Sequence, residues 1–259
     1  MGDIVYFDTT IVYILLYHES TRNFQTYNVL HQIFINKQIG TQHMKAVLEQ
    51  TRKYVRGKFE GEGSGHDWWH IQRVVNLALV LAEKEHADQY IVELAALLHD
   101  IADYKFHGGD TEIGPKTARA WLESLSVQAP IVDHVCDIVA HVSYKGAGVP
   151  TPMKTVEGMV VQDADRLDAM GAIGIGRTFA YGGSKGTVMH NPDVAPQLHS
   201  TADAYLNKGN SSVINHFHEK LLLLKDRMNT ETAKKMAEER HQFMEQYLEQ
   251  FHHEWKGLR

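Results

Sequence analysis

The chain has 259 residues, a length that suits one large domain or two small ones, and it carries 26 basic and 32 acidic residues for a net charge of -6. This mild acidity argues against a protein that binds nucleic acid or an anionic membrane, because both reward a basic surface. The single cysteine excludes a disulfide framework and a thiolate-rich zinc site, and it fits a reducing compartment, so we expect a cytoplasmic protein. No apolar run approaches the length of a membrane span. The 17 histidines make a metal site or an acid–base site worth seeking.

The composition changes near Met44. Residues 1–43 are rich in Tyr, Thr, Ile and Asn and show no sustained helical period, whereas a helical pattern begins at Met44. We therefore expect residues 1–43 to be a short N-terminal extension of unclear role and residues 44–259 to form the main domain.

Helical periodicity continues along almost all of the main domain. Asp67 and Asp88 are suited to cap the helices that follow them. Further helices are expected over about residues 111–125, 130–142, 155–171, 211–229 and 230–255. Because almost no segment alternates with period two, the sequence predicts an all-α fold.

Histidine and aspartate residues are placed on three of these helices in a way that suggests a shared site. His99 and Asp100 are adjacent at the end of an apolar helix, His70 begins another helix, and Asp165 lies in a third. Each residue alone would most often be a hydrogen-bonded core residue, but buried carboxylates without partners are costly. Two imidazoles and two carboxylates form a mixed set that suits a first-row divalent ion with water in the remaining positions. The four residues are therefore candidate metal ligands.

These four positions resemble the His…His-Asp…Asp signature of the HD-domain metal-dependent phosphohydrolases. The match includes His-x-x-Arg-Val at His70, Leu-Leu-His-Asp-Ile at the doublet and Ala-Asp-Arg-Leu at Asp165, and it covers about residues 44–225. Gly-His-Asp-Trp-Trp-His and Asp-Ala-Asp-Arg-Leu-Asp-Ala-Met-Gly-Ala-Ile-Gly look like the small bacterial nucleotide pyrophosphohydrolases of this superfamily. The resemblance implies a single HD-domain helical bundle, with a metal-site core over about residues 66–170 and C-terminal helices over about residues 199–255.

The resemblance also implies a hydrolase with a divalent metal cofactor. Manganese is our first choice for the ion, with magnesium, cobalt, nickel, iron and zinc as the others. We expect hydrolysis of nucleoside or deoxynucleoside triphosphates to monophosphate and pyrophosphate through a water activated by the metal. Two alternatives stay open: an HD-type phosphodiesterase acting on a cyclic nucleotide or an alarmone, and a metal-binding regulatory protein without turnover. The expected partner is a small-molecule phosphate substrate rather than nucleic acid or membrane, and a homodimer is an open option.

Other polar residues near the ligands are candidates for catalysis and positioning. His141 is a candidate general acid, since a pKa near neutrality suits proton donation to a leaving oxygen, although a histidine at the edge of the core is nearly as common. His66 and Asp67 precede His70 closely and could take part in catalysis, or Asp67 could serve only as a helix cap. Candidates for ordering the site are Arg73, Asp103 and Asp168.

A phosphate chain needs cations beside the transferred group. We expect the substrate to contact Lys145, Arg177, Tyr181 and Lys185, although each basic residue could equally be a solvated surface charge. Asp163 stands two residues before Asp165 and therefore on a different face of the same helix, so both carboxylates cannot easily bind one ion.

Overall fold

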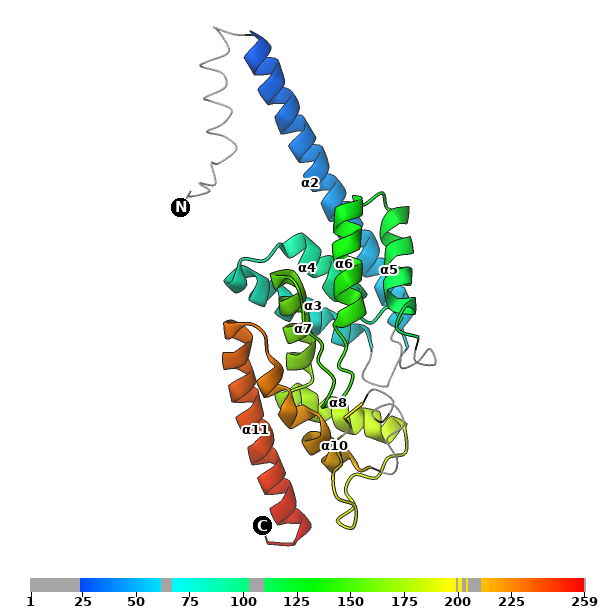
Figure 1. Ribbon diagram of the computed structural model, residues 1–259, viewed down its shortest axis with the longest axis vertical. Coiled ribbons are helices and arrows are strands. Elements are labelled where there is room, and N and C mark those ends of the chain that lie inside the picture. Colours follow the sequence, from blue (N-terminus) through cyan, green and yellow to red (C-terminus); the bar gives the residue numbers. More distant parts are fainter. Residues whose placement is uncertain are drawn as a thin grey trace. The chain divides into compact units, whose positions relative to one another are not determined.

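The structure is a computed structural model, and it describes residues 24–61, 67–102, 110–198, 200–201, 204 and 211–258. Over these residues every regular element is a helix and no strand is present, which confirms the predicted all-α fold (Figure 1). The chain divides into two compact units, residues 1–47 and residues 48–259. None of the helices in the described part is long and apolar enough to cross a membrane.

The first described helix, α2 (Phe24–Phe59), begins well before Met44. The prediction that helical structure starts at Met44 was therefore wrong at its N-terminal end. The side chains of residues 36–46 are all exposed. A helix that is exposed all round has no apolar stripe, so its sequence carries no hydrophobic period that could reveal it.

The last turns of α2 are tied to the helices that follow. The Arg52 guanidinium donates hydrogen bonds to Gln72 at 2.8 Å and to Glu93 at 2.6 Å. The Tyr54 ring stacks on the Trp121 ring with 4.0 Å between the centroids. These contacts join the C-terminal end of α2 to the helices that carry Gln72, Glu93 and Trp121.

The centre of the second unit is α7 (Val156–Asp168), which packs against α3 (Trp68–Glu85) and α4 (Gln89–Leu98). Most of the residues of α7 are buried, including four polar ones, Gln162, Asp163, Arg166 and Asp168. Side-chain caps define where α3 and α4 begin, because Asp67 accepts a hydrogen bond from the His70 backbone and Asp88 caps α4 in the same way. The packing brings the first turn of α3, the end of α4 and the last turns of α7 together.

The remaining helices surround this centre. They are α5 (Ile113–Ser124), α6 (Ala129–His141), α8 (Gly171–Ser184), α10 (Val213–Glu219) and α11 (Glu231–Trp255). The first two of these pair with each other, and α6 also packs on α4. Helix α11 packs along α7 and α8, so that the C-terminal helices cover the side of α7 away from α6 (Figure 1).

Residues 171–184 form a further helix, which the sequence analysis did not predict, since its expected helix ended at about residue 171. The chain turns at Gly171, whose φ of +67° is a left-handed conformation that favours glycine. A Cβ at Gly171 would also lie 3.1 Å from the Cγ atom of Arg240 on α11. This glycine therefore separates α7 from α8 and lets α8 begin at once, whereas the later glycines are accommodated inside the helix.

Residues 211–229 are not the single helix that the pattern indicated. Helix α10 ends at Glu219, and two short 3-10 turns, Leu221–Leu223 and Lys225–Arg227, follow it. Lys220 has φ −143° and ψ −59°, which lies outside the helical region. The run of apolar residues at 221–224 continues the hydrophobic pattern through this break, which is why the sequence did not reveal it.

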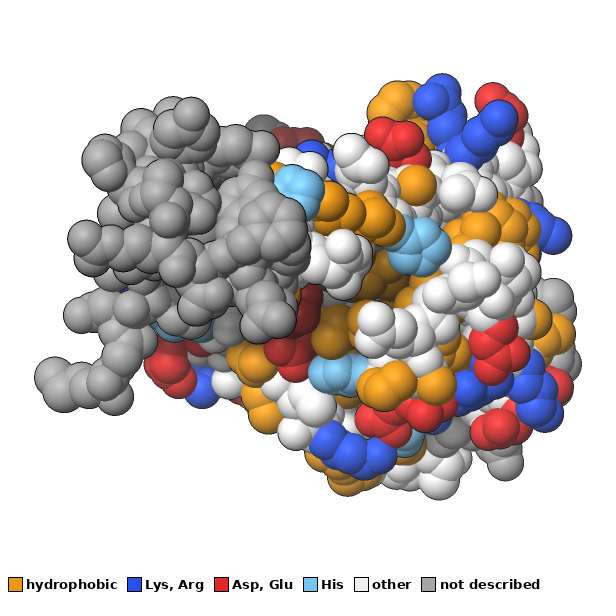
Figure 2. Space-filling view, turned by 90° about the horizontal axis from the view of Figure 1, so that it is seen from above, with side chains coloured by type: hydrophobic (Ala, Val, Ile, Leu, Met, Phe, Trp, Pro, Cys, Tyr) orange, Lys and Arg blue, Asp and Glu red, His pale blue; other side chains and the backbone are white. Residues whose placement is uncertain are grey.

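The surface carries charges of both signs. On the face drawn in Figure 2, Lys and Arg side chains lie next to Asp and Glu side chains toward the edges, and hydrophobic and histidine side chains lie in the middle of the view. Pairs such as Arg119 with Asp133, at 2.6 Å, illustrate this neighbouring of opposite charges.

Candidate metal centre

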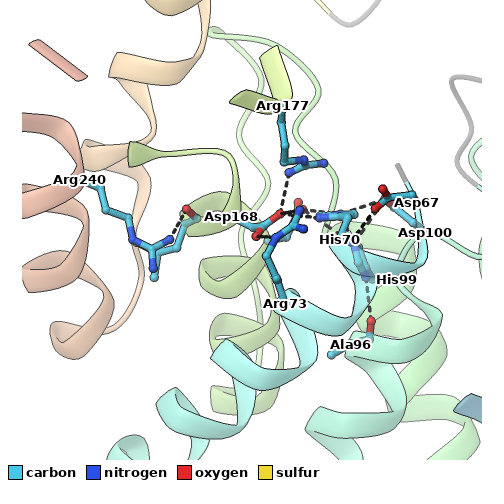
Figure 3. A network of polar contacts seen from close by, with 11 residues as sticks. Asp67, His70, Arg73, Ala96, His99, Asp100, Asp168, Arg177 and Arg240 are labelled. Carbon is cyan, nitrogen blue, oxygen red and sulfur yellow. Dashed lines mark hydrogen bonds and ion pairs between the residues drawn. The ribbon is translucent and has the colours of Figure 1, made fainter. Parts of the chain in front are cut away.

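Four side chains from three helices converge on one point. The Nε2 atoms of His70 and His99 lie 3.2 Å apart. The Oδ2 atom of Asp100 is 3.3 Å from the His70 nitrogen and 3.4 Å from the His99 nitrogen. The Oδ1 atom of Asp165 is 3.6 Å and 3.8 Å from the same two nitrogens. Figure 3 shows how His70, His99 and Asp100 face one another between α3 and the end of α4.

The cluster is closed on its histidine side and open on its aspartate side. The side chains of His70 and His99 are each 1% exposed. Exposure rises to 10% for Asp100 and 26% for Asp165. A small molecule would therefore reach the cluster past the two carboxylates.

Hydrogen bonds to the far ring nitrogens orient both imidazoles. His70 Nδ1 lies 2.7 Å from Asp168 Oδ2, and His99 Nδ1 lies 2.8 Å from the Ala96 carbonyl oxygen. A proton on each Nδ1 would satisfy these acceptors and leave the lone pair of each Nε2 aimed at the cluster. Metal-binding histidines are held in this way in proteins generally.

Asp168 holds the His70 ring in its orientation and has several polar partners. Besides His70, its carboxylate accepts hydrogen bonds from Arg73 Nε at 2.7 Å and from Arg177 at 2.9 Å (Figure 3). Burial alone would raise the pKa of Asp168, but the hydrogen bonds from His70 and Arg73 and the charge of Arg177 hold it well below its ordinary value. Asp168 is therefore ionised, and two guanidinium groups compensate its charge.

The electrostatics of the cluster favour added positive charge. Burial would lower the pKa of His99, but the carboxylate of Asp100, with Asp165, raises it to about 9. Burial would likewise raise the pKa of Asp100, and the His99 and His70 imidazoles lower it well below its usual value. In the protein without a bound ion, the positive charge of a protonated imidazole thus offsets negative charge on the carboxylates.

This donor set fits a divalent cation. Ligand atoms of His70, His99 and Asp100 all lie within 4.8 Å of one another, so these residues could hold a metal ion. A divalent ion would supply the positive charge that the two carboxylates attract. Mixed imidazole and carboxylate sets suit several first-row ions.

A small pocket opens beside the cluster, and its walls differ in charge. It is lined by Asp100, Ser143, Tyr144, Asp165, Arg166, Ala169, Arg177, Lys220 and Leu224. We call the two candidate ligands in this lining (Asp100 and Asp165) the acidic wall, and its three cationic residues (Arg166, Arg177 and Lys220) the basic wall. The pocket therefore joins candidate metal ligands to a group of cations.

Of the candidate substrate contacts, only Arg177 lines this pocket. Lys145 lies in the loop after α6 but is not part of the pocket wall. Tyr181 and Lys185 are exposed at the end of α8, where the Lys185 ammonium lies 5.8 Å from the centre of the Tyr181 ring. The structure places these three residues away from the pocket lining, and their contact with substrate stays a prediction.

The candidate catalytic residues have local structural partners. Asp67 Oδ1 accepts the His70 backbone N–H at 2.9 Å and so caps α3. His141 ends α6, where its Nδ1 lies 2.7 Å from the backbone oxygen of Asp137, and its side chain is 43% exposed. His66 and Asp103 lie outside the described residues.

Asp163 has a different setting from its two neighbouring aspartates. It is fully buried and accepts hydrogen bonds of 2.8 to 2.9 Å from the backbone and side chains of Asn229 and Thr230. Burial raises its pKa more than these hydrogen bonds lower it. Asp163 thus ties α7 to the start of α11 and does not face the cluster.

Sequence reasoning missed most of the basic wall. Arg166 directly follows Asp165, which is the one signal that could have suggested it. Its guanidinium donates to Thr151 Oγ1 at 2.8 Å and to the Arg227 carbonyl, and burial lowers its pKa to about 10, so it stays charged at neutral pH. Lys220 and Tyr144 belong to segments without a recognisable motif, and only the fold brings them to the pocket.

Comparison with known proteins places this geometry in context. The HD domain family matches residues 68–170. YpgQ of Bacillus subtilis is 38% identical over 219 residues, which cover 81% of this chain and 94% of YpgQ. An HD-superfamily hydrolase from Bacillus thuringiensis is 44% identical, with a TM-score of 0.63 over 82% of this chain and 98% of that one. Crystallised YpgQ in complex with ADP is 39% identical, with a TM-score of 0.64 over 82% of this chain and all of that one.

Proposed function

The chain belongs to the HD-domain superfamily of hydrolases, and on this premise we propose that it hydrolyses nucleoside or deoxynucleoside triphosphates to a monophosphate and pyrophosphate. The superfamily supports the broader activity, metal-dependent hydrolysis of a phosphate ester or anhydride. The ADP complex of YpgQ supports a nucleotide as the ligand of this chain as well.

In this proposal His70, His99, Asp100 and Asp165 hold the divalent ion. Manganese is our first choice, and magnesium, cobalt, nickel, iron and zinc are the others. A bound divalent ion lowers the pKa of water and neutralises phosphate charge. Asp168 keeps His70 in its binding orientation, because it receives the Nδ1 side of the ring and is itself held by Arg73 and Arg177.

The basic wall would then hold the phosphate chain. A triphosphate cleaved at the α-phosphorus releases pyrophosphate, which carries its negative charge without needing a proton from the protein. Fixed cations stabilise such a leaving group, and Arg166, Arg177 and Lys220 line the pocket where it would lie. His141 has no described contact with this pocket, so the leaving step relies on charge more than on a general acid.

One observation carries the proposal: four convergent ligand atoms lie beside a pocket that three cationic side chains also line. An isolated structural metal site would need no such wall. A substrate with several phosphates matches both walls at once, because its phosphates bridge a divalent ion and fixed cations.

The test combines metal analysis with product analysis. The purified protein is stripped with chelator, reloaded with manganese and mixed with one nucleoside triphosphate, and the products are separated by chromatography. We expect no turnover without metal, and monophosphate plus pyrophosphate with it. Diphosphate plus orthophosphate would contradict cleavage at the α-phosphorus. Turnover of a cyclic nucleotide or an alarmone alone would favour the phosphodiesterase alternative, and metal binding without any turnover would favour a regulatory protein.

A further inference from the structure

We propose that Lys220 binds the part of a polyphosphate chain that lies beyond the phosphate held at the candidate metal ligands, and that it thereby selects substrates with more than one phosphate. This inference rests on the proposed function and adds to it a residue that selects the length of the phosphate chain.

The break in the C-terminal helices positions Lys220. Helix α10 ends at Glu219, and the non-helical backbone of Lys220 turns the chain into the 3-10 turn that follows. The Lys220 side chain is half-buried and lines the same pocket as Asp100 and Asp165. A lysine in a continuous helix would have followed the direction of α10, so the break is what places this cation at the pocket.

The Lys220 ammonium lies over a buried aromatic ring. Its ammonium lies 5.3 Å from the centre of the Tyr144 ring, and the Arg227 guanidinium lies 5.1 Å from the same ring centre. Tyr144 is 4% exposed, so the ring is a fixed support. The residue before Lys220 is anchored too, because buried Glu219 accepts a hydrogen bond of 2.7 Å from the Ser211 hydroxyl.

The other cations at this site already have partners. Arg177 donates to Asp168, and Arg166 donates to Thr151 and to the Arg227 carbonyl. The Arg227 guanidinium donates to backbone oxygens of the loop after α6. Among the described residues, by contrast, no acidic side chain pairs with Lys220. Its three N–H donors are therefore available to a ligand in the pocket.

The chemistry of lysine and the position of Lys220 indicate which class of ligand this residue would bind. An ammonium group is a compact cation that binds phosphate as a point charge. Lys220 shares the pocket with Asp100 and Asp165 but forms no ion pair with either, so a phosphate bound at the cluster need not reach it. A second phosphate on the same chain would extend from the cluster into the pocket that Lys220 also lines. Pyrophosphate and nucleoside di- and triphosphates fit this description, and orthophosphate does not.

The experiment measures binding, so it does not depend on turnover. Manganese affinity of the full chain is measured first by titration calorimetry, and pyrophosphate and orthophosphate are then titrated into the manganese-loaded protein. For Lys220→Gln we expect unchanged manganese affinity, unchanged orthophosphate affinity and about tenfold weaker pyrophosphate binding. Lys220→Arg should restore most of the loss. Lys234→Gln is the matched control, since Lys234 is an exposed lysine on α11 that pairs with Glu231 at 2.6 Å.

Equal pyrophosphate affinities in the original protein and Lys220→Gln, or no pyrophosphate binding by the manganese-loaded protein, would overturn the inference. If Lys220→Gln does not fold, lysine acetylation of the unaltered protein decides the question: pyrophosphate should protect Lys220 from the reagent, and equal labelling with and without it would overturn the inference. Loss of pyrophosphate binding in Lys220→Gln in a protein that hydrolyses no nucleotide would uphold the role of Lys220 and reject the proposed function.

Discussion

The two walls of the pocket are built in different ways. The acidic wall and its histidines come from well-defined helix positions: the first turn of α3, the residues that end α4, and a late turn of the buried α7. The basic wall takes Arg166 from α7, Arg177 from α8 and Lys220 from a helix break. The side suited to an ion is thus preorganised by helix packing, whereas the side suited to a substrate also depends on a residue at a helix break.

A related contrast occurs within α7, where three aspartates have different sets of partners. Asp163 binds the start of α11, Asp165 faces the imidazoles of the cluster, and Asp168 binds His70 and two arginines. A spacing of two residues turns Asp163 to another face of the helix, whereas a spacing of three keeps Asp165 and Asp168 on one face, where both lie beside His70. Position on the helix, more than residue type, therefore decides which carboxylate can bind an ion.

The largest effect should come from removing one of the candidate metal ligands. We expect His99→Ala or Asp100→Ala to abolish bound manganese and to lower kcat/KM by about a thousandfold or more, because the charge that a metal neutralises is worth several kcal/mol. Metal analysis after dialysis and a hydrolysis assay measure both. Asp133→Ala is the control, since Asp133 is exposed and pairs only with Arg119 among the described residues. Normal metal content in either ligand variant would refute the assignment.

Substitutions at Asp163 and at Asp165 should have different effects, one mainly on stability and the other mainly on metal binding. Asp163→Ala leaves buried donors of Asn229 and Thr230 without an acceptor, so the free energy of unfolding should fall by about 3 kcal/mol. Asp165→Ala should cost less stability in chelator than Asp163→Ala does, since the Asp165 side chain is 26% exposed and gives up only its interaction with the imidazoles, and it should lose the metal. Urea denaturation in chelator checks the first effect and metal analysis the second. The reverse pattern would show that the two aspartates have exchanged roles.

Asp168→Asn should weaken metal binding without removing a ligand. The neutral amide cannot balance the positive charges of Arg73 and Arg177, and it holds the His70 ring less firmly. We therefore expect a metal affinity about 10- to 100-fold lower. Titration calorimetry with manganese measures the change. Arg73→Lys, which keeps a cation beside Asp168, is the matched milder variant. An affinity equal to that of the unaltered protein would mean that Asp168 has no part in orienting His70.

The smallest effect concerns the start of α8, which carries Arg177. Gly171→Ala should destabilise the protein by about 1–2 kcal/mol, because alanine is strained at a φ of +67° and would press on Arg240. Gly176→Ala is the control, and its effect on stability should be opposite. No atom lies near the added Cβ at this position inside α8, so alanine should stabilise the helix by about 1 kcal/mol. Thermal denaturation of the two variants compares them, and equal shifts would remove the special role of Gly171.

These differences explain what the sequence could and could not reveal. Caps such as Asp67 and Asp88 and the amphipathic periods of α3 and α4 are local features, so the helices around the cluster were predictable. The convergence of Asp165 on His70 could be expected from the motif context. Lys220 could not, because its position depends on a break inside an apolar run and on packing between segments far apart in the chain. The exposed part of α2 carried no pattern either, since nothing in it faces a core.

Hydrolysis in water enriched in oxygen-18 tests the central claim most directly. The manganese-loaded protein is mixed with one nucleoside triphosphate in labelled water, and the products are weighed by mass spectrometry. Attack at the α-phosphorus, with the leaving phosphates held by the basic wall, predicts one labelled oxygen in the monophosphate and none in the pyrophosphate. Label in pyrophosphate, release of labelled orthophosphate, or the absence of turnover would contradict the account.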